Sequence, residues 1–128
     1  MLDKQLIGAI FEHGRGPVVK IILPLKLPSL ANARLHWRAL DKIKRSQKDA
    51  VTAWMRHRQF PPLPVVVTIT RIGKRRLDGD NLQAAAKYVR DQIAAIYETD
   101  DGSDLFVWRY EQRLGETYAV EIDIEPVT

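Results

Sequence analysis

The strongest constraint on the fold is an apolar pattern in the second half of the chain that repeats with the period of an α-helix. Its members are Leu82, Ala85, Ala86, Val89, Ile93, Ile96 and Tyr97. Such a stripe buries one face of a helix against a partner. The segment from Asn81 to Tyr97 is therefore predicted to be one helix, with Asp80 as its N-cap and Gln83 completing a capping box.

Segments typical of β-strands lie on both sides of this helix. They are VVKIIL at 18–23, PVVVTITRIG at 64–73, LFVWRYEQ at 105–112 and YAVEIDIE at 118–125. The first three are rich in β-branched or aromatic residues, and the last alternates strictly. The last two segments flank a turn and are expected to pair as antiparallel strands. A second amphipathic helix, with a basic side, is predicted from Ala39 to Arg58.

The order strand, helix, strand, helix, strand, strand predicts an α+β fold, with about four strands in a mixed sheet and two main helices. The 128 residues fit a single domain spanning 1–128, and residues 1–16 are expected to form a flexible N-terminal extension. Cysteine is absent, which excludes disulfides, thiolate zinc sites and a cysteine nucleophile. Because no apolar run approaches the roughly 18 residues of a membrane span and no secretory signal is present, we expect a cytoplasmic protein without a membrane partner.

Basic residues exceed acidic ones and gather in two segments. The net charge of +4 suits a polyanionic partner such as DNA. The candidate phosphate contacts are Lys42, Arg45, Lys48 and Arg56 on the first helix, and Lys74, Arg75 and Arg76 before the second. A merely solvated helix face explains the first group equally well. No P-loop or dinucleotide-binding glycine pattern is present, so no nucleotide cofactor is expected.

Aspartates gather at both ends of the long predicted helix, in KRRLDGDN and in ETDDGSD. Mg²⁺ takes oxygen ligands and needs only a few protein carboxylates, and Asp78 and Asp80 supply two of them. Gly79 between them is expected to allow a tight backbone path. Helix capping and turn formation explain the same residues without a metal. A helix of about seventeen residues, roughly 25 Å long, separates Asp78 from Asp101, so the fold must bring the two loops together if both bind one cation.

The order of these motifs resembles that of the RusA-like Holliday-junction resolvases, a family of crossover junction endodeoxyribonucleases. In that family a basic stretch runs into D-x-D-N and is followed by a helix, a D-D turn and a strand. Here these motifs read KRRLDGDN, LQAAAKYVRDQIAAIYE, TDDGSD and LFVWRYEQ, and the resemblance covers roughly 71–112. The N-terminal third is also similar, with KIILPLKLPS followed by an Asn-containing segment and a basic helix.

This resemblance implies a homodimer that binds four-way DNA junctions and cuts two strands symmetrically, in recombination and repair, with Mg²⁺ or Mn²⁺ as the cofactor. By position, it implies that Asp78, Asp80 and Asp101 bind the metal, with Asp100 in support, and that Asn81 contacts DNA. A metal held by these carboxylates would activate water and offset charge on the scissile phosphate.

The family also has a catalytic lysine early on the helix, in a K-x-x-x-D pattern. Lys87 and Asp91 match this pattern, which makes Lys87 the candidate. Lys87 follows Asn81 by six residues, whereas about three are expected. Three residues are nearly one helical turn, about 4.5 Å, so the lysine could face a similar direction from farther away.

Two other functions remain open at this point. A DNA-binding or assembly protein without catalysis would use the aspartates only as caps and turns, and a nuclease could prefer flaps, forks or other branched DNA. The three histidines are too scattered for a zinc motif. Trp54 and Trp108 lie on apolar stripes, which favours core packing over stacking on DNA bases.

Overall fold

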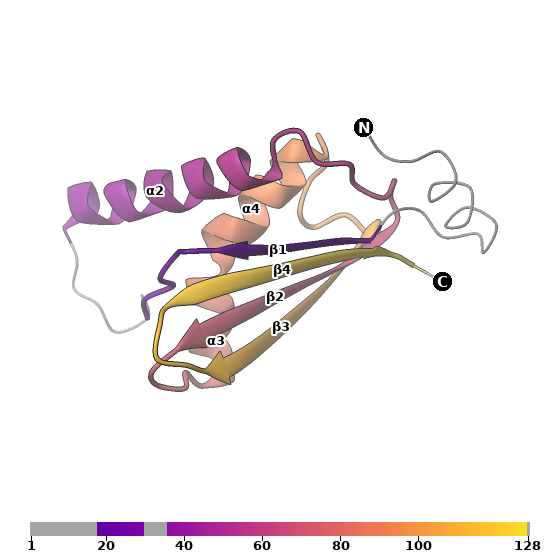
Figure 1. Ribbon diagram of the computed structural model, residues 1–128. Coiled ribbons are helices and arrows are strands. Elements are labelled where there is room, and N and C mark those ends of the chain that lie inside the picture. Colours follow the sequence, from indigo (N-terminus) through magenta and orange to yellow (C-terminus); the bar gives the residue numbers. More distant parts are fainter. Residues whose placement is uncertain (1–17, 30–35, 128) are drawn as a thin grey trace.

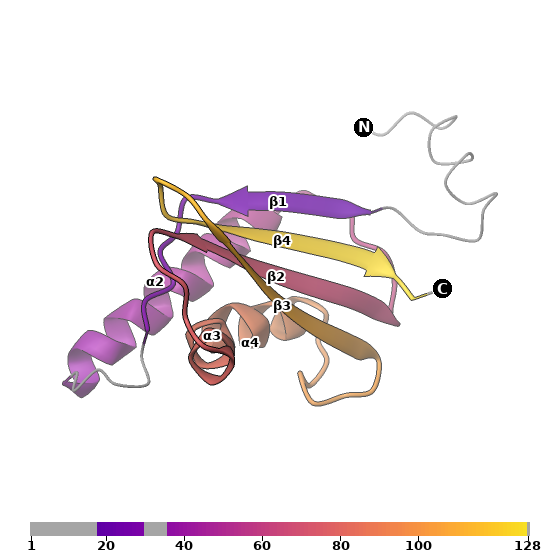
Figure 2. The ribbon, with the colours of Figure 1, turned by 90° about the horizontal axis from the view of Figure 1, so that it is seen from below.

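The computed structural model describes residues 18–29 and 36–127. Within these ranges, four strands form one mixed sheet and three helices cover one of its faces (Figures 1 and 2). The elements are β1 (Val19–Leu23), α2 (Trp37–Met55), β2 (Val65–Gly73), α3 (Gly79–Ala85), α4 (Lys87–Ile96), β3 (Phe106–Leu114) and β4 (Ala119–Pro126). The predicted α+β fold with a mixed sheet is confirmed. The expected extension at 1–16 lies outside the described residues.

The sheet has the strand order β1-β4-β2-β3. β2 and β3 are parallel neighbours, because α3 and α4 carry the chain back along the sheet before β3 begins (Figure 2). β4 lies between β1 and β2 and is antiparallel to both. The predicted antiparallel pairing of 105–112 with 118–125 is therefore wrong, since β2 separates these two strands.

The connection from β3 to β4 explains this arrangement. Gly115 donates its backbone N–H to Gly73 O at 3.0 Å, so the chain passes the end of β2 before β4 begins. A Cβ at Gly115 would lie 2.9 Å from Ile72 Cγ2, which leaves little room for any other residue there. In the sheet interior, β4 gains a hydrogen-bonded neighbour on each side and buries Val120, Ile122 and Ile124 fully.

The core lies between the sheet and the helices. Alternate residues of β1, β2 and β4 point into it, and α2 and α4 cover them. The fully buried members include Ile21, Leu23, Val65, Val67, Ile69, Val120, Ile122, Ile124, Val51, Val89 and Ile93. Burial of this kind stabilises a fold by about 25 cal/mol for each Å² of apolar surface removed from water.

The first predicted helix is confirmed, with shifted ends. α2 begins at Trp37, after His36, whose ring accepts a hydrogen bond from Arg38 N, and it ends at Met55. Its buried stripe is narrow, so Trp54 at the stripe's edge is 42% exposed, contrary to the core position expected for it. Trp108 packs against the core as expected. No helix in the described ranges is both long and apolar enough to cross a membrane.

The second predicted helix is divided into two. α3 ends at Ala85 and α4 begins at Lys87, and between them Ala86 N shares its hydrogen bond between Leu82 O and Gln83 O. This shared bond is typical of a tightened turn. Ala85 and Ala86 are both fully buried, so the apolar stripe continues through the break and gives no sign of it in the sequence.

The predicted capping box is also wrong. The N-cap of α3 is Asp78, whose side chain makes no capping hydrogen bond, and Asp80 lies in the first turn. The helix begins early because Leu77 is fixed to β3 by two hydrogen bonds with the Gln112 side chain, and the chain turns directly after it.

Figure 2 shows one sheet face turned away from the helices. Paired charges lie on this face. Lys20 Nζ lies 3.5 Å from Glu121 Oε1 and 4.0 Å from Asp123 Oδ1. Burial raises the pKa of Asp123 above its usual value, and Glu121 and Glu125 add to the rise while Lys20 opposes it. A carboxyl group with a raised pKa in the folded state binds its proton more tightly there than in the unfolded chain.

Asp123→Asn is therefore expected to change the pH dependence of stability. In the wild type, the raised pKa of Asp123 contributes to the free energy of unfolding. This contribution is full below the pKa of the unfolded state, about 4, and is lost as the pH rises through the higher pKa of the folded state. The variant should lose less stability than the wild type over this window, although it also gives up an exposed ion pair worth at most about 1 kcal/mol. Urea unfolding at pH values on both sides of the window measures the difference, with Glu116→Gln as the exposed control. An unchanged pH dependence in Asp123→Asn would contradict this reading.

Candidate functional site

Asp78 and Asp80 lie where β2 has ended and α3 begins. Leu77 N donates to Gln112 Oε1 at 2.9 Å, and Gln112 Nε2 donates to Leu77 O at 2.6 Å. Leu82 N then donates to Asp78 O at 2.9 Å, which closes the first turn of α3. The carboxylates of Asp78 and Asp80 are both exposed. The pair is thus anchored to β3 on its N-terminal side while its side chains remain accessible to solvent.

Gly79 does not have the role expected of it. It is the first residue of α3, and a Cβ there would meet no atom within 4 Å. The backbone path between the two aspartates therefore does not depend on glycine.

Gly79→Ala is accordingly expected to raise the free energy of unfolding by about 0.5 kcal/mol. Alanine fits the helical backbone at this position and restricts the unfolded chain more than glycine does. The midpoint of urea unfolding measures the effect. A loss of stability would mean that the backbone at this position needs the freedom of glycine after all.

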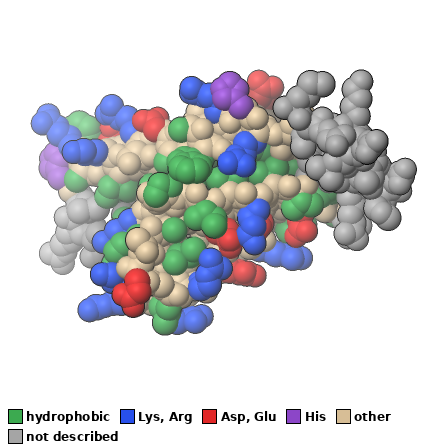
Figure 3. Space-filling model, viewed as in Figure 1, with side chains coloured by type: hydrophobic (Ala, Val, Ile, Leu, Met, Phe, Trp, Pro, Cys, Tyr) green, Lys and Arg blue, Asp and Glu red, His purple; other side chains and the backbone are tan. Residues whose placement is uncertain are grey.

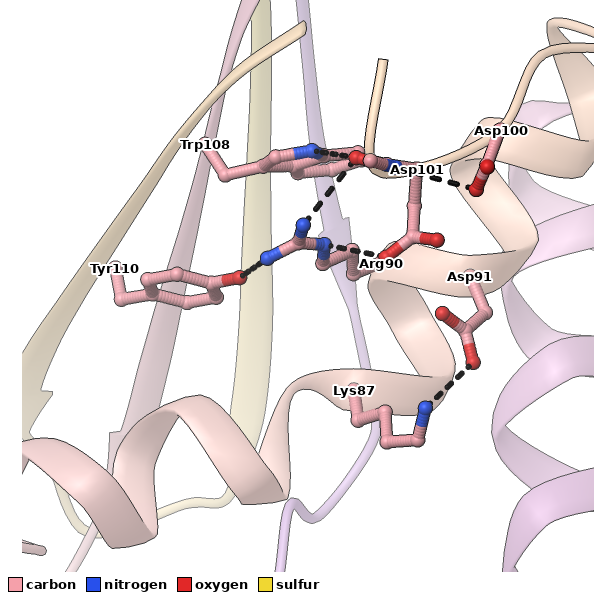
Figure 4. Close-up of polar contacts among 8 residues, drawn as sticks. Lys87, Arg90, Asp91, Asp100, Asp101, Trp108 and Tyr110 are labelled. Atoms are coloured by element: carbon pink, nitrogen blue, oxygen red, sulfur yellow. Dashed lines mark hydrogen bonds and ion pairs between the residues drawn. The ribbon is translucent and has the colours of Figure 1, made fainter.

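The second aspartate group, in the loop between α4 and β3, is folded against α4 (Figure 4). Asp101 Oδ2 lies 2.9 Å from Arg90 Nε as an ion pair in which the N–H is not aimed at the oxygen. Arg90 also donates through Nη2 to Asp101 O at 3.2 Å and through Nη1 to the Tyr110 hydroxyl at 2.6 Å. Trp108 Nε1 donates to Asp101 O at 2.8 Å, and its ring centroid lies 4.9 Å from the Arg90 guanidinium carbon.

These contacts give Asp101 a cationic partner already. Burial by itself lowers the pKa of Arg90, but its contacts with Tyr110 and Asp101 outweigh burial and raise it overall, so the guanidinium stays charged. Asp100, next in the chain, accepts a hydrogen bond from Gly102 N at 3.2 Å through Oδ1, as in a simple turn.

The loop nevertheless lies closer to the first pair than helix length alone suggests. Asp101 contacts Arg90, which lies in the first turn of α4 and only ten residues after Asp80, rather than a residue near the C-terminal end of α4. Within the described residues, no three acidic or histidine side chains come together as a metal-binding group. The structure thus places Asp78 with Asp80, and Asp101 with Arg90, at two separate positions.

Lys87 is the first residue of α4, directly after the break. Its Nζ lies 3.5 Å from Asp91 Oδ2 on the same helix (Figure 4). The K-x-x-x-D pattern is therefore an exposed helical ion pair in this structure, of a kind worth a few tenths of a kcal/mol. The catalytic role of Lys87 stays a prediction.

The candidate DNA-contacting residues lie in two places. Lys74, Arg75 and Arg76 are exposed in the loop after β2, while Asn81 is half-buried on α3. Lys42, Arg45 and Lys48 lie on α2 and Arg56 is its C-cap, and acidic residues lie among them, with Arg45 Nε 2.9 Å from Asp41 Oδ2. Figure 3 shows basic side chains both along α2 and at the end of the molecule where β2 stops and α3 begins.

Three residues that organise the site were missed from the sequence. Arg71 and Gln112 are polar residues at the core-facing positions of alternating strands, and that mismatch is the signal that could have found them. Arg90 gives no such signal, because its partners come from a loop and a strand that only the fold brings together.

A comparison with protein-family models, curated proteins and solved structures finds no match to this chain.

Proposed function

We propose that this protein is a divalent-metal-dependent endonuclease that cuts branched DNA, with the Holliday junction as its substrate. The observation that carries the proposal is the exposed pair Asp78 and Asp80, anchored through Leu77 to Gln112 and preceded by Lys74, Arg75 and Arg76. Two carboxylates leave most coordination positions of Mg²⁺ or Mn²⁺ for water and phosphate oxygens. The motif order that resembles the RusA-like resolvases supports the same function.

Each residue has a distinct part in this proposal. Asp78 and Asp80 hold the cation, which supplies an activated water and a Lewis acid for the scissile phosphate. In the sequence, Arg76 precedes the aspartate pair and Lys87 follows it. The positive charges of these two side chains stabilise the negative charge of that phosphate. A homodimer would present two such sites to the two symmetric strands of a junction.

Asp101 belongs to the proposed site under one condition. Its Oδ2 atom lies against Arg90, so both oxygens of the carboxylate become available to the same cation only when Arg90 has another anionic partner. A DNA phosphate is a suitable replacement partner for a guanidinium group. The proposal therefore links the third ligand, supported by Asp100, to the arrival of the substrate.

The non-catalytic alternative has an observation of its own. The Asp101 carboxylate and the Asp100 turn are satisfied by protein groups, as expected of residues that only shape a loop. In that case the basic residues would bind DNA and the aspartates would never hold a metal.

A substrate panel separates these functions. The full chain is incubated with labelled four-way junction, flap and linear duplex, each with Mg²⁺, Mn²⁺ or a chelator. The proposal predicts metal-dependent paired cuts in the junction and little cutting of the duplex. Preferential cutting of the flap would reassign the substrate. Junction binding without cutting under either metal would favour the non-catalytic alternative and contradict the proposal.

A further inference from the structure

A pocket of about 460 Å³ with a basic lining lies at the end of β2, next to the aspartate pair. Its charged and aromatic lining comes from Lys26, Arg71, Lys74, Arg75 and Tyr118. Leu77 also lines it, and Leu77 directly precedes Asp78. We call these residues the β2-end pocket.

Arg71 gives this pocket a buried cation that hydrogen bonds hold in place. Only 6% of the residue is exposed. Its Nε donates to Leu27 O at 2.8 Å and its Nη1 to Arg75 O at 2.7 Å, which fixes the guanidinium between two loops. Nη2 has no partner among the described residues. Burial lowers the pKa of Arg71, because water solvates the charge of the buried guanidinium group poorly.

Gly73 makes the space in which this guanidinium lies. A Cβ at Gly73 would come within 2.9 Å of Arg71 Nη1 and 3.2 Å of Nη2. A side chain at position 73 would therefore have to push the Arg71 head group out of this position.

The other cations converge on the same space. Lys26 Nζ lies 4.6 Å and Lys74 Nζ 5.9 Å from the centroid of the Tyr118 ring. None of Lys26, Arg71, Lys74 and Arg75 forms an ion pair with a carboxylate in the described part of the chain. Like charges held together repel one another, and an anion bound among them relieves that repulsion.

We infer that the β2-end pocket binds a phosphate group of the DNA backbone, through the Arg71 guanidinium and the ammonium groups of Lys26 and Lys74. Guanidinium and ammonium donors match the charge and oxygen geometry of a phosphate. DNA as the source of this phosphate rests on the proposed function, whereas free phosphate has the same chemistry. Because Leu77 links the pocket to Asp78, the bound phosphate would position the strand beside the aspartate pair.

The first arm of the test uses inorganic phosphate. Thermal unfolding of the full chain is followed with increasing phosphate and with chloride of matched ionic strength. A saturable rise in Tm with phosphate is expected for the wild type and for Lys44→Gln, an exposed lysine of α2 outside the pocket. The rise should be lost in Lys26→Gln and Lys74→Gln, whose exposed side chains leave the fold intact. It should also be lost in Gly73→Ala, which displaces the guanidinium without changing any charge.

The second arm uses four-way junction DNA in chelator, so that cutting plays no part. Lys26→Gln and Lys74→Gln should each weaken binding, and the slope of log affinity against log salt should become shallower by about one, while Lys44→Gln keeps the wild-type slope.

If phosphate raises the Tm equally in the wild type and the pocket variants, or not at all, the pocket is not a phosphate site. If the variants lose the phosphate effect but keep the wild-type salt slope, free phosphate is the ligand and the DNA assignment is wrong. A protein that passes both arms and never cuts DNA would contradict the proposed nuclease activity alone.

Discussion

Asp78→Asn and Asp80→Asn are each expected to abolish metal-dependent cutting of a four-way junction while leaving junction binding intact. The amide keeps the size of the side chain but removes the charge that holds a divalent cation. Loss of a mere supporting contact to a metal site costs ten- to a hundredfold in activity, so loss of a ligand should cost at least about a hundredfold. Both side chains are exposed and make no capping hydrogen bond that the fold needs, so stability should change little.

Two measurements make this expectation specific. Cleavage rates are compared at saturating protein, and junction affinity is measured separately in chelator. Asp49→Asn, on the exposed side of α2, removes the same charge far from the pair in sequence and should cut like the wild type. If both site variants cut at the wild-type rate, the aspartate pair is not the metal site.

Arg90→Met is expected to lower the free energy of unfolding by about 2 kcal/mol. The methionine keeps an apolar chain but removes the guanidinium over Trp108, which leaves Asp101 without its ion pair and the Tyr110 hydroxyl without a donor. A lost hydrogen-bond partner in a partly buried site costs about 1–3 kcal/mol. The ion pair adds little, because the Arg90 and Asp101 side chains are 28% and 36% exposed.

Urea unfolding measures this loss, and the neighbouring ion pair supplies the control. Lys87→Met breaks the contact of Lys87 with Asp91, which is an exposed pair within one helix, and should cost only a few tenths of a kcal/mol. Equal losses in the two variants would show that Arg90 does not hold the loop between α4 and β3 in place.

The local part of the fold could be predicted from the sequence, because periodicity is a local property. The apolar stripes located all four strands and both helical regions correctly. Strand neighbours depend on contacts between distant segments, so the position of β4 between β1 and β2 was not accessible in this way. The break at Ala86 was hidden because it leaves the buried stripe continuous.

The candidate site, like the fold, has a local part that the sequence predicts and a long-range part that it does not. Asp78 and Asp80 are two residues apart, and local chemistry together with the family resemblance singled them out as candidates, whose metal binding stays a prediction. Gln112 fixes Leu77 from 35 residues away, and Arg71 binds the carbonyl of Leu27 across 44 residues. Such pairs have no signature in spacing, and only a polar residue on the core-facing side of a strand hints at them.

The central claim is that Asp80 holds a divalent cation during DNA cleavage, and a change of metal preference tests it most directly. The chain has no cysteine, so Asp80→Cys introduces a single thiolate at the site. Thiolates bind soft or borderline metals in preference to Mg²⁺. The proposal predicts that this variant loses cutting of the four-way junction with Mg²⁺ and regains it with Cd²⁺, while Asp49→Cys keeps the wild-type preference. Cutting by Asp80→Cys with Mg²⁺ at the wild-type rate would contradict the claim.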